Sequence, residues 1–306
     1  MTKRPDNAPA GERLREYDLS DPDRKLSYNR RLFRVVAPRY DLATRLLAFG
    51  QDQRWKRHLV RHLPRSDNVR ALDLACGTGD LTLRLTRRFL RGSVTGVDMD
   101  GRMLASARRR LRSAGTANWS LVQADMTRLP LESAQFDVVT GGYALRNAPD
   151  LRMALEEIHR VLRPGGSVAV LEFRRSPNAR IAALELRLLA GWGRFWGIVL
   201  HGDADVYGYI AESLRHFPDA QELNRLLRAA GFSSVRGRTL MVGLLAITRF
   251  RKPVRSPRAS AVGGGDHRKV AQNSPPEGGG EERRDEPVAR PGSGAAADGA
   301  DPHRGS

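Results

Sequence analysis

Apolar residues recur along the chain with two different spacings, and segments of the two kinds alternate between residues 69 and 250. Short apolar runs predict strands at residues 69–74, 93–98, 119–122, 136–141, 167–173, 233–238 and 241–248. Apolar residues at helical spacing predict helices at residues 80–90, 101–113, 150–162 and 219–230. Pro164-Gly-Gly166 predicts a turn before the fifth strand. This alternation indicates a doubly wound α/β fold, in which a mainly parallel seven-stranded sheet carries helices on both faces.

The segments around this core follow other patterns. Residues 1–26 are polar and predict a flexible N-terminus, while apolar spacing over residues 27–63 predicts N-terminal helices with a break at Pro38. Residues 27–250 form the predicted domain. From residue 251 to 306 the composition turns to Gly, Pro, Ala, Ser and mixed charge, which predicts a disordered tail because too little apolar surface can be buried.

Residues 174–206 interrupt the alternation with a more aromatic segment. An apolar helical stripe runs through Ile181, Leu184, Leu188 and Leu189 and leads to a cluster that includes Trp192, Phe195 and Trp196. The segment is interpreted as a lid packed on the sheet. The alternative is a surface that binds a hydrophobic substrate or contacts lipid.

The net charge of the 306-residue chain is +18, and half of it lies in one segment. Residues 24–63 hold eleven Lys and Arg against two acidic residues, whereas the tail from residue 251 contributes only +2. Arginine outnumbers lysine throughout, which base composition of the genome can explain, but the clustering favours contact with nucleic acid or an anionic membrane surface.

Other features narrow the class of protein. A single cysteine, Cys76, excludes an intrachain disulfide and suits a cytosolic protein. No run of 18 apolar residues and no apolar leader are present, so we expect a cytoplasmic enzyme, peripheral at the inner face of the membrane if it contacts lipid. The seven histidines form no cluster with carboxylates, and no metal site is predicted.

A glycine-rich loop follows the first predicted strand. It contains Gly77 and Gly79, and the second strand ends at Asp98, 19 residues after Gly79. In a doubly wound sheet these strand ends share one edge, where glycines let a ligand approach the backbone and the acid binds a ribose diol. The loop therefore predicts a nucleoside-containing cofactor.

The residues around the loop indicate which cofactor. A dinucleotide fingerprint requires a third small residue, but Thr82 stands at that position. Asp73 within the strand and Asp80 after the loop disfavour a pyrophosphate and suit a cationic ligand that contains adenosine. That description fits S-adenosylmethionine. A dinucleotide and a purely structural glycine turn remain as alternatives.

Two further strand ends carry candidate site residues. Asp125 and Met126 follow the third strand, where a carboxylate can accept a hydrogen bond from the exocyclic amine of adenine. The fourth strand leads into Gly141-Gly142 and then to Arg146 and Asn147. Small residues there leave room for cofactor and substrate, while Arg146 and Asn147 offer polar groups in an otherwise apolar cleft.

Short, distinctive motifs are spread over residues 28–250: Ala37-Pro-Arg-Tyr-Asp41, Asp73-Leu-Ala-Cys-Gly-Thr-Gly-Asp80, Ala144-Leu-Arg-Asn147, Arg160-Val-Leu-Arg-Pro-Gly-Gly166 and Asp205-Val-Tyr-Gly-Tyr-Ile-Ala-Glu-Ser213. Together they resemble the quinone C-methyltransferases, which make menaquinone from demethylmenaquinone or methylate the matching benzoquinol. The resemblance implies a class I methyltransferase fold with S-adenosylmethionine held by Thr78, Asp98, Asp125 and Met126. The chain departs from the family at Gly142, where a serine is frequent.

The resemblance also implies a reaction, namely carbon methylation of a polyprenyl quinol, with demethylmenaquinol as the expected substrate. We expect Arg146 to stabilise the phenolate, or alternatively to form a structural salt bridge, and Tyr40 or a water to relay the proton, with Asn147 nearby. The alternatives are a benzoquinol substrate, or a soluble small molecule if residues 181–200 are fully buried.

Two other classes are disfavoured. A nucleic-acid methyltransferase would need an aromatic-rich platform after the fourth strand, and none is present. A degenerate cofactor-binding scaffold without activity is disfavoured because Asp73, Gly77, Gly79 and Asp98 are all in place. Prenyl length and oligomeric state are not predicted.

Overall fold

The computed structural model describes residues 19–254, except for the side chain of Val242. The predicted flexible ends therefore fall mostly on residues 1–18 and 255–306, which lie outside the described residues. Helix α1 begins at Pro22, five residues before the predicted start of the domain at residue 27. At the other end the last strand continues to Arg251, one residue into the expected tail.

The centre of the domain is a seven-stranded sheet with the strand order β3-β2-β1-β4-β5-β7-β6. Every neighbouring pair from β3 to β5 is parallel, and β7 is antiparallel to both β5 and β6. This confirms the predicted doubly wound, mainly parallel sheet. The strands are β1 (Arg70–Leu74), β2 (Ser93–Asp98), β3 (Trp119–Gln123), β4 (Phe136–Gly142), β5 (Leu162–Phe173), β6 (Ser233–Leu240) and β7 (Leu245–Arg251).

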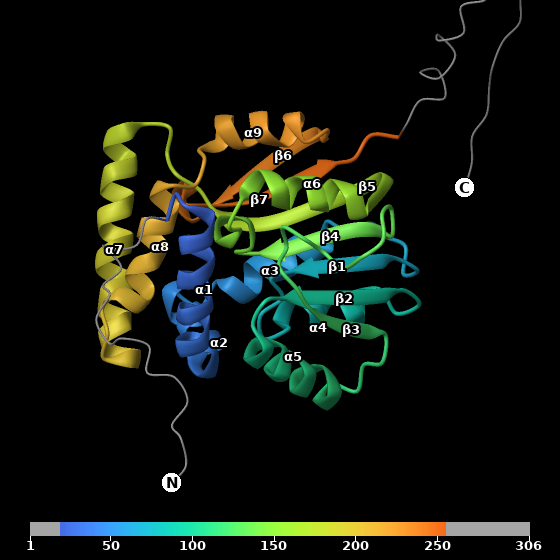
Figure 1. Cartoon of the computed structure of the whole chain (residues 1–306), viewed down its shortest axis with the longest axis horizontal. Helices are drawn as coiled ribbons and strands as arrows, with labels where there is room; N and C mark the ends of the chain where they lie inside the picture. Colours follow the sequence, from blue (N-terminus) through green and yellow to red (C-terminus); the bar gives the residue numbers. More distant parts are fainter. Residues whose placement is uncertain (1–18, 255–306) are drawn as a thin grey trace, which may run out of the picture. The chain divides into compact units, whose positions relative to one another are not determined.

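Helices cover both faces of the sheet, as Figure 1 shows. Both faces need cover because side chains of one strand are buried on both sides of the sheet. In β1, Ala71 belongs to a first core cluster on one face, and Leu72 and Leu74 belong to a second cluster on the other face. The first cluster includes α3 (Asp52–Arg61) and α4 (Asp80–Arg88), and the second includes α6 (Leu151–Val161) and α9 (Ala220–Ala229). Helix α5 (Gly101–Ser113) packs beside β2 and β3. The period-2 alternation of the strands thus divides the core into two layers.

A third cluster of helices stands beside the carboxyl ends of the parallel strands (Figure 1). It joins α1 (Pro22–Val36), α2 (Tyr40–Leu47), α7 (Ala179–His201) and α8 (Asp205–Arg215). Helices α7 and α8 pack closely because two glycines face the neighbouring backbone. A Cβ at Gly193 would lie 2.5 Å from Tyr207 O, and one at Gly197 would lie 2.4 Å from Asp203 O.

Several sequence predictions need correction. Pro164–Gly166 lies within β5 as a bulge, because Leu162 pairs with Phe136 and Ser167 with Val138, so it is not a turn before that strand. The last strand begins at Leu245 rather than residue 241, after a 3₁₀ turn at Met241–Gly243. Helix α8 was not among the predicted helices.

Candidate active site

The loop between β1 and α4 contains Gly77 and Gly79, which let its backbone adopt left-handed conformations. Gly77 has φ +55° and Gly79 has φ +78°, both in the left-handed region. A Cβ at Gly79 would also lie 2.9 Å from Ala107 Cβ, so this glycine lets α4 approach α5. The Gly77 N–H points at the next strand end and donates to Asp98 Oδ2 at 2.8 Å.

Asp98 is the central acidic group of this site. Its side chain ends β2, is buried, and accepts hydrogen bonds from the backbone N–H groups of Gly77 and Asp100. Burial raises the pKa of Asp98 to about 6, because desolvation of the carboxylate outweighs the hydrogen bonds that favour the charged form. The carboxylate is therefore ionised at neutral pH and still has lone pairs to accept hydroxyl groups.

A cavity at the carboxyl ends of the strands contains most of the predicted cofactor residues: Gly77, Asp98, Asp125, Met126 and Gly142. Asp125 Oδ1 accepts from the Thr127 N–H and hydroxyl, both at 2.9 Å, which fixes its carboxylate. A Cβ at Gly142 would come no closer than 3.9 Å to another residue, so this position is open.

The lining of this cavity fits S-adenosylmethionine. Two carboxylates, Asp98 and Asp125, are its acidic groups, and none of the described residues that line it is basic. A pyrophosphate would lack a counter-charge here, whereas a ribose diol, an adenine amine and a sulfonium all suit acceptor groups. Met99, Met103 and Met126 supply apolar, adaptable walls.

Three predicted residues support the loop without lining the cavity. Gly79 supports the loop because it lets α4 pack closely against α5. Asp73 in β1 is fully buried. Asp73 accepts from Thr82 Oγ1 at 2.7 Å and Thr140 Oγ1 at 3.0 Å, which ties β1 to α4 and β4. Burial raises its pKa to about 7.

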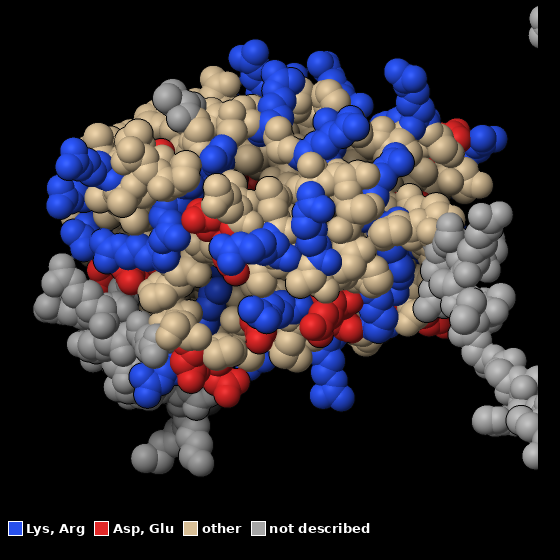
Figure 2. Space-filling model, turned by 90° about the horizontal axis from the view of Figure 1, so that it is seen from above, with Lys and Arg blue, Asp and Glu red and all other residues tan. Residues whose placement is uncertain are grey.

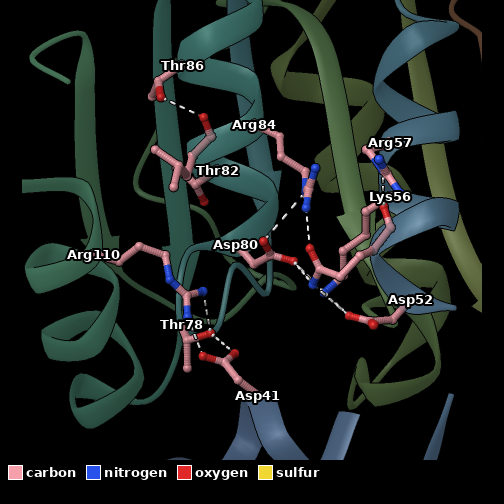
Figure 3. Close-up of polar contacts among 12 residues, drawn as sticks. Asp41, Asp52, Lys56, Arg57, Thr78, Asp80, Thr82, Arg84, Thr86 and Arg110 are labelled. Atoms are coloured by element: carbon pink, nitrogen blue, oxygen red, sulfur yellow. Dashed lines mark hydrogen bonds and ion pairs between the residues drawn. The ribbon is translucent and has the colours of Figure 1, made fainter. Parts of the chain in front are cut away.

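The third, Thr78, is turned toward the N-terminal helices. Its hydroxyl donates to Asp41 at 2.6 Å and accepts from Arg110 at 3.1 Å, and Arg110 also pairs with Asp41 (Figure 3). This contact joins α2, the glycine loop and α5. The N-terminal helices also cover the cavity itself, because Asn29, Phe33 and Tyr40 belong to its lining.

A second polar network holds α3 against the start of α4 (Figure 3). Lys56 Nζ lies 2.9 Å from Asp80 Oδ2 and 3.5 Å from Asp52 Oδ2, and Gln53 donates to both carboxylates. Lys56 and Asp52 are buried, and the nearby acids raise the pKa of Lys56 despite the opposing effect of burial. This network was not predicted from the sequence, because Asp80 lies 24 to 28 residues after the other three members.

A larger, mostly apolar cavity of about 570 Å³ lies beside the first. Its walls come from α1, α2, α7 and α8, together with residues after β4, at the end of β5 and before β7. Apolar and aromatic side chains dominate, among them Leu32, Leu47, Phe49, Leu189 and Trp192. Arg146 and Glu185 are its charged groups among the described residues. Such a cavity suits a bulky hydrophobic ligand with one polar end.

The two cavities meet at four shared residues, which are Phe33, Tyr40, Tyr143 and Asn147. Tyr143 has φ +59°, a rare conformation for a residue with a side chain, and burial raises the pKa of its hydroxyl well above the usual value. Phe33 and Tyr143 were not predicted as site residues, although the position of Tyr143 directly after β4 was a usable signal. The junction places a bound cofactor and a ligand of the apolar cavity side by side.

Arg146 is the basic residue among the described residues that line the apolar cavity, and it directly precedes Asn147 of the junction. The side chain is buried, and its guanidinium lies 5.5 Å from the ring centre of Phe173 and 5.7 Å from that of Tyr209. Its Nε lies 3.6 Å from Glu172 Oε1, and its Nη1 donates to Ser213 Oγ. Arg146 therefore forms a buried ion pair, as one of its two interpretations expected, and it also lines the apolar cavity. Its role toward a phenolate stays a prediction. Its Nε is buried against Glu172 and makes no hydrogen bond within the described part of the chain.

Tyr40 and Asn147 complete the polar groups. Burial raises the pKa of Tyr40, so its hydroxyl stays protonated and can only pass a proton onward rather than remove one as a phenolate. Asn147 Nδ2 donates to Tyr143 O at 2.8 Å, while its Oδ1 accepts from the Tyr209 hydroxyl at 3.2 Å. Its backbone carbonyl accepts from Asn29 at 2.8 Å, which links the junction to α1.

The strand order and the acidic nucleoside cavity at the carboxyl edge define a class I methyltransferase that uses S-adenosylmethionine. The chain belongs to the ubiE/COQ5 methyltransferase family, whose model matches residues 23–252. It is therefore a carbon methyltransferase of that family.

Individual relatives agree with this assignment. The chain is 40% identical over 216 residues to demethylmenaquinone methyltransferase of Thermus thermophilus, covering 71% of this chain and 97% of that protein. It is 37% identical to the ubiquinone/menaquinone biosynthesis C-methyltransferase UbiE of Proteus mirabilis, covering 76% and 93%. A chain in the solved complex of the Haloferax volcanii Trm112 methyltransferase activator with a methyltransferase aligns with TM-score 0.53 at 18% identity, covering 72% and 97%, which shows the shared fold.

Proposed function

We propose that this enzyme methylates a ring carbon of a polyprenyl quinol, with demethylmenaquinol converted to menaquinol as the physiological reaction. The observation that carries the proposal is the apolar cavity of about 570 Å³ that adjoins the cofactor cavity and holds a buried arginine at the junction. A quinol ring and prenyl chain match such a cavity, with the ring oxygens toward Arg146 and the chain along the apolar walls.

The mechanism follows from the groups at the junction. A quinol ring carbon is a weak nucleophile until a phenolic proton leaves, so the enzyme must align the carbon with the donor and stabilise a phenolate. When bound, S-adenosylmethionine would supply an electrophilic methyl group and leave as S-adenosylhomocysteine. The hydrogen on the methylated carbon would return to the phenolate oxygen, so that one proton is lost overall. Arg146 offers its positive charge to the phenolate oxygen. Tyr40, protonated and placed in both cavities, passes the proton toward solvent.

The mouth of the apolar cavity supports delivery of the substrate from a membrane. Helix α7 exposes Ile181, Leu184, Leu188, Phe195, Ile198 and Val199 along one face. The predicted lid is thus buried only on its other face, where Ala182, Leu189 and the two packing glycines lie. The condition that favoured a soluble substrate, full burial of residues 181–200, is not met.

Charged residues border this exposed face. Arg180, Arg187 and Arg194 are exposed and recur every seven residues, so they lie along one side of the apolar stripe. Helix α7 is therefore suited to lie at a membrane interface, with apolar side chains in the lipid and arginines among anionic headgroups. No helix in the described part of the chain is long and apolar enough to span a membrane.

The substrate assignment is tested in two steps. The quinones of cells that lack the protein are extracted, and we expect demethylmenaquinone to accumulate. Purified enzyme is then offered short-chain demethylmenaquinol and the corresponding demethylated benzoquinol. Methylation of the benzoquinol alone would overturn the naphthoquinol assignment, while the family assignment would stand.

The membrane contact is tested by co-sedimentation with vesicles. We expect binding to rise with anionic lipid, to fall with salt, and to weaken when Leu188 and Phe195 are both replaced by serine. The matched control is Leu90→Ser, because Leu90 is also strongly exposed but follows α4, outside the cavity lining. Equal binding by all three proteins would contradict the proposed interface.

A further inference from the structure

A third cavity has a different chemistry from the two described above. It encloses about 410 Å³, and the basic residues of its lining are Arg54, Arg57, His58, Arg61 and Arg238. The first four recur at helical spacing on the exposed face of α3, opposite the face that buries Lys56 and Leu59. Arg238 reaches the same space from β6. Two elements far apart in the sequence thus build one concave, basic surface.

Nothing within the described part of the chain neutralises this charge. None of the four arginines forms an ion pair with an acidic side chain there, and no carboxylate belongs to the lining. Asp52 and Asp80, the acids near α3, are engaged with Lys56 in the buried network. Figure 2 shows on one face of the molecule how far basic side chains outnumber acidic ones.

The protonation of His58 is affected by the positive charges around the cavity. Its Nε2 accepts from Arg238 Nη1 at 3.0 Å, which requires a neutral ring with the proton on Nδ1. Partial burial and the nearby His62, Arg238, Arg249 and Arg61 lower the pKa of His58. An anion in the cavity would offset this repulsion and accept hydrogen bonds from several guanidinium groups at once.

The basic cavity adjoins the apolar cavity. Trp55 lines both, and Leu240 of the basic cavity directly precedes Met241 of the apolar one. Phe49, two residues before Gln51 of the basic cavity, stacks on Trp192 of α7 with ring centres 4.8 Å apart. A molecule held at the arginines would therefore lie at the edge of the surface that α2 and α7 expose.

We propose that this basic cavity binds the phosphate of an anionic phospholipid headgroup and thereby holds the mouth of the apolar cavity against the bilayer. The proposal rests on the proposed function for its orientation, since a lipid-borne substrate makes that orientation useful. A phosphodiester flanked by acyl chains fits the arrangement because the anion sits at the arginines while the chains continue along the neighbouring apolar surface. A free phosphate or a nucleic acid shares the anionic group but would make no use of that apolar surface.

The test compares two variants with the same loss of charge. Arg57→Gln/Arg61→Gln removes two guanidinium groups of the cavity, and Arg102→Gln/Arg108→Gln removes two exposed arginines from α5, outside the three cavities. Each protein is measured by co-sedimentation with phosphatidylcholine vesicles, with and without phosphatidylglycerol. Inorganic phosphate and a short single-stranded RNA serve as soluble competitors.

We expect the cavity variant to bind phosphatidylglycerol vesicles about tenfold more weakly than the unmodified protein. The α5 variant should lose less than about threefold, since its charges act only at long range. Equal losses by the two variants would overturn the proposal in favour of a general charge effect. Displacement by inorganic phosphate or RNA at concentrations comparable to that of the lipid phosphate would assign the cavity to a soluble anion instead.

A separate measurement distinguishes this proposal from the substrate assignment. With a short-chain quinol in the absence of vesicles, the cavity variant should turn over at the unmodified rate, because the arginines lie outside both catalytic cavities. If no quinol is methylated but the vesicle results hold, the substrate assignment fails and the headgroup site stands. Loss of turnover without vesicles would show that the arginines act within the catalytic site and would overturn the proposal.

Discussion

The two cavities that meet at Tyr40 and Asn147 are built in opposite ways. The cofactor cavity is formed largely at the ends of successive strands, and its two carboxylates are fixed by nearby backbone and hydroxyl groups. The apolar cavity is formed by helices that cross the edge of the sheet, and its wall combines residues from Leu32 to Leu245. Polar specificity is thus supplied by a rigid strand edge, whereas the space for the hydrophobic ligand depends on how α1, α2, α7 and α8 pack.

Each cavity is therefore sensitive to a different kind of substitution. Loss of one carboxylate in the cofactor cavity removes a directed interaction and leaves the sheet intact. The apolar cavity has few directed interactions, so packing changes in the helices, or loss of its buried arginine, affect it most.

The largest effect is expected at Arg146. Arg146→Gln should lower kcat by about 100-fold or more, because the fixed cation beside the phenolate is lost, while affinity for S-adenosylmethionine should change little. This variant also leaves Glu172 buried without its ion-pair partner, which can destabilise the fold. The double variant Arg146→Gln/Glu172→Gln restores a neutral pair and is the control for folding. Full activity in the double variant would show that Arg146 serves only the structure.

The second largest effect is expected in the cofactor cavity. Asp98→Ala should weaken binding of S-adenosylmethionine by on the order of 2 kcal/mol or more, because a buried acceptor for the ribose hydroxyls is lost. Isothermal titration calorimetry measures this directly. The melting temperature without cofactor is measured in parallel, so that a loss of fold is not mistaken for a loss of binding. Unchanged affinity would exclude Asp98 from the ribose site.

The third prediction concerns the packing of α7 and compares two glycines of this helix, one closely packed and one open. Gly193→Ala should lower the free energy of unfolding by roughly 1–3 kcal/mol, because the new Cβ would meet Tyr207 O at 2.5 Å. Gly191 has nothing within 4 Å of an added Cβ. Gly191→Ala should therefore stabilise the protein by about 0.5–1 kcal/mol through its helix propensity. Urea unfolding distinguishes the two, and effects of the same sign would contradict the α7–α8 packing.

The smallest expected effect is that of pH on the affinity for S-adenosylmethionine. The ionised form of Asp98 accepts the ribose hydroxyls, and its pKa is raised to about 6 by burial. Affinity for S-adenosylmethionine should thus be constant above pH 6 and fall as the pH drops below it, by up to about tenfold per pH unit. In Asp98→Asn this dependence should vanish, because no titrating acceptor remains. A profile that is the same in both proteins would assign the dependence to another group.

The cofactor half of this protein could be predicted from its sequence because its determinants are local. The apolar runs, Gly77 and Gly79 in the loop, and the acids at the strand ends each follow from residues close together in the chain, and topology then brings those ends to one edge. The doubly wound sheet was predicted for the same reason, and the errors at Pro164–Gly166 and at Leu245 concern only the limits of strands.

The contacts between residues far apart in the sequence are visible only in the tertiary structure. The pairing of Arg146 with Glu172, the turn of Thr78 toward Asp41 and Arg110, and the placement of Arg238 beside α3 depend on how helices pack onto the sheet edge. No periodicity encodes these partners, since side chains far apart in sequence meet only when the packing is complete. Local sequence patterns were enough to predict a fold with a nucleoside site, while the apolar cavity beside it forms only when the helices pack together.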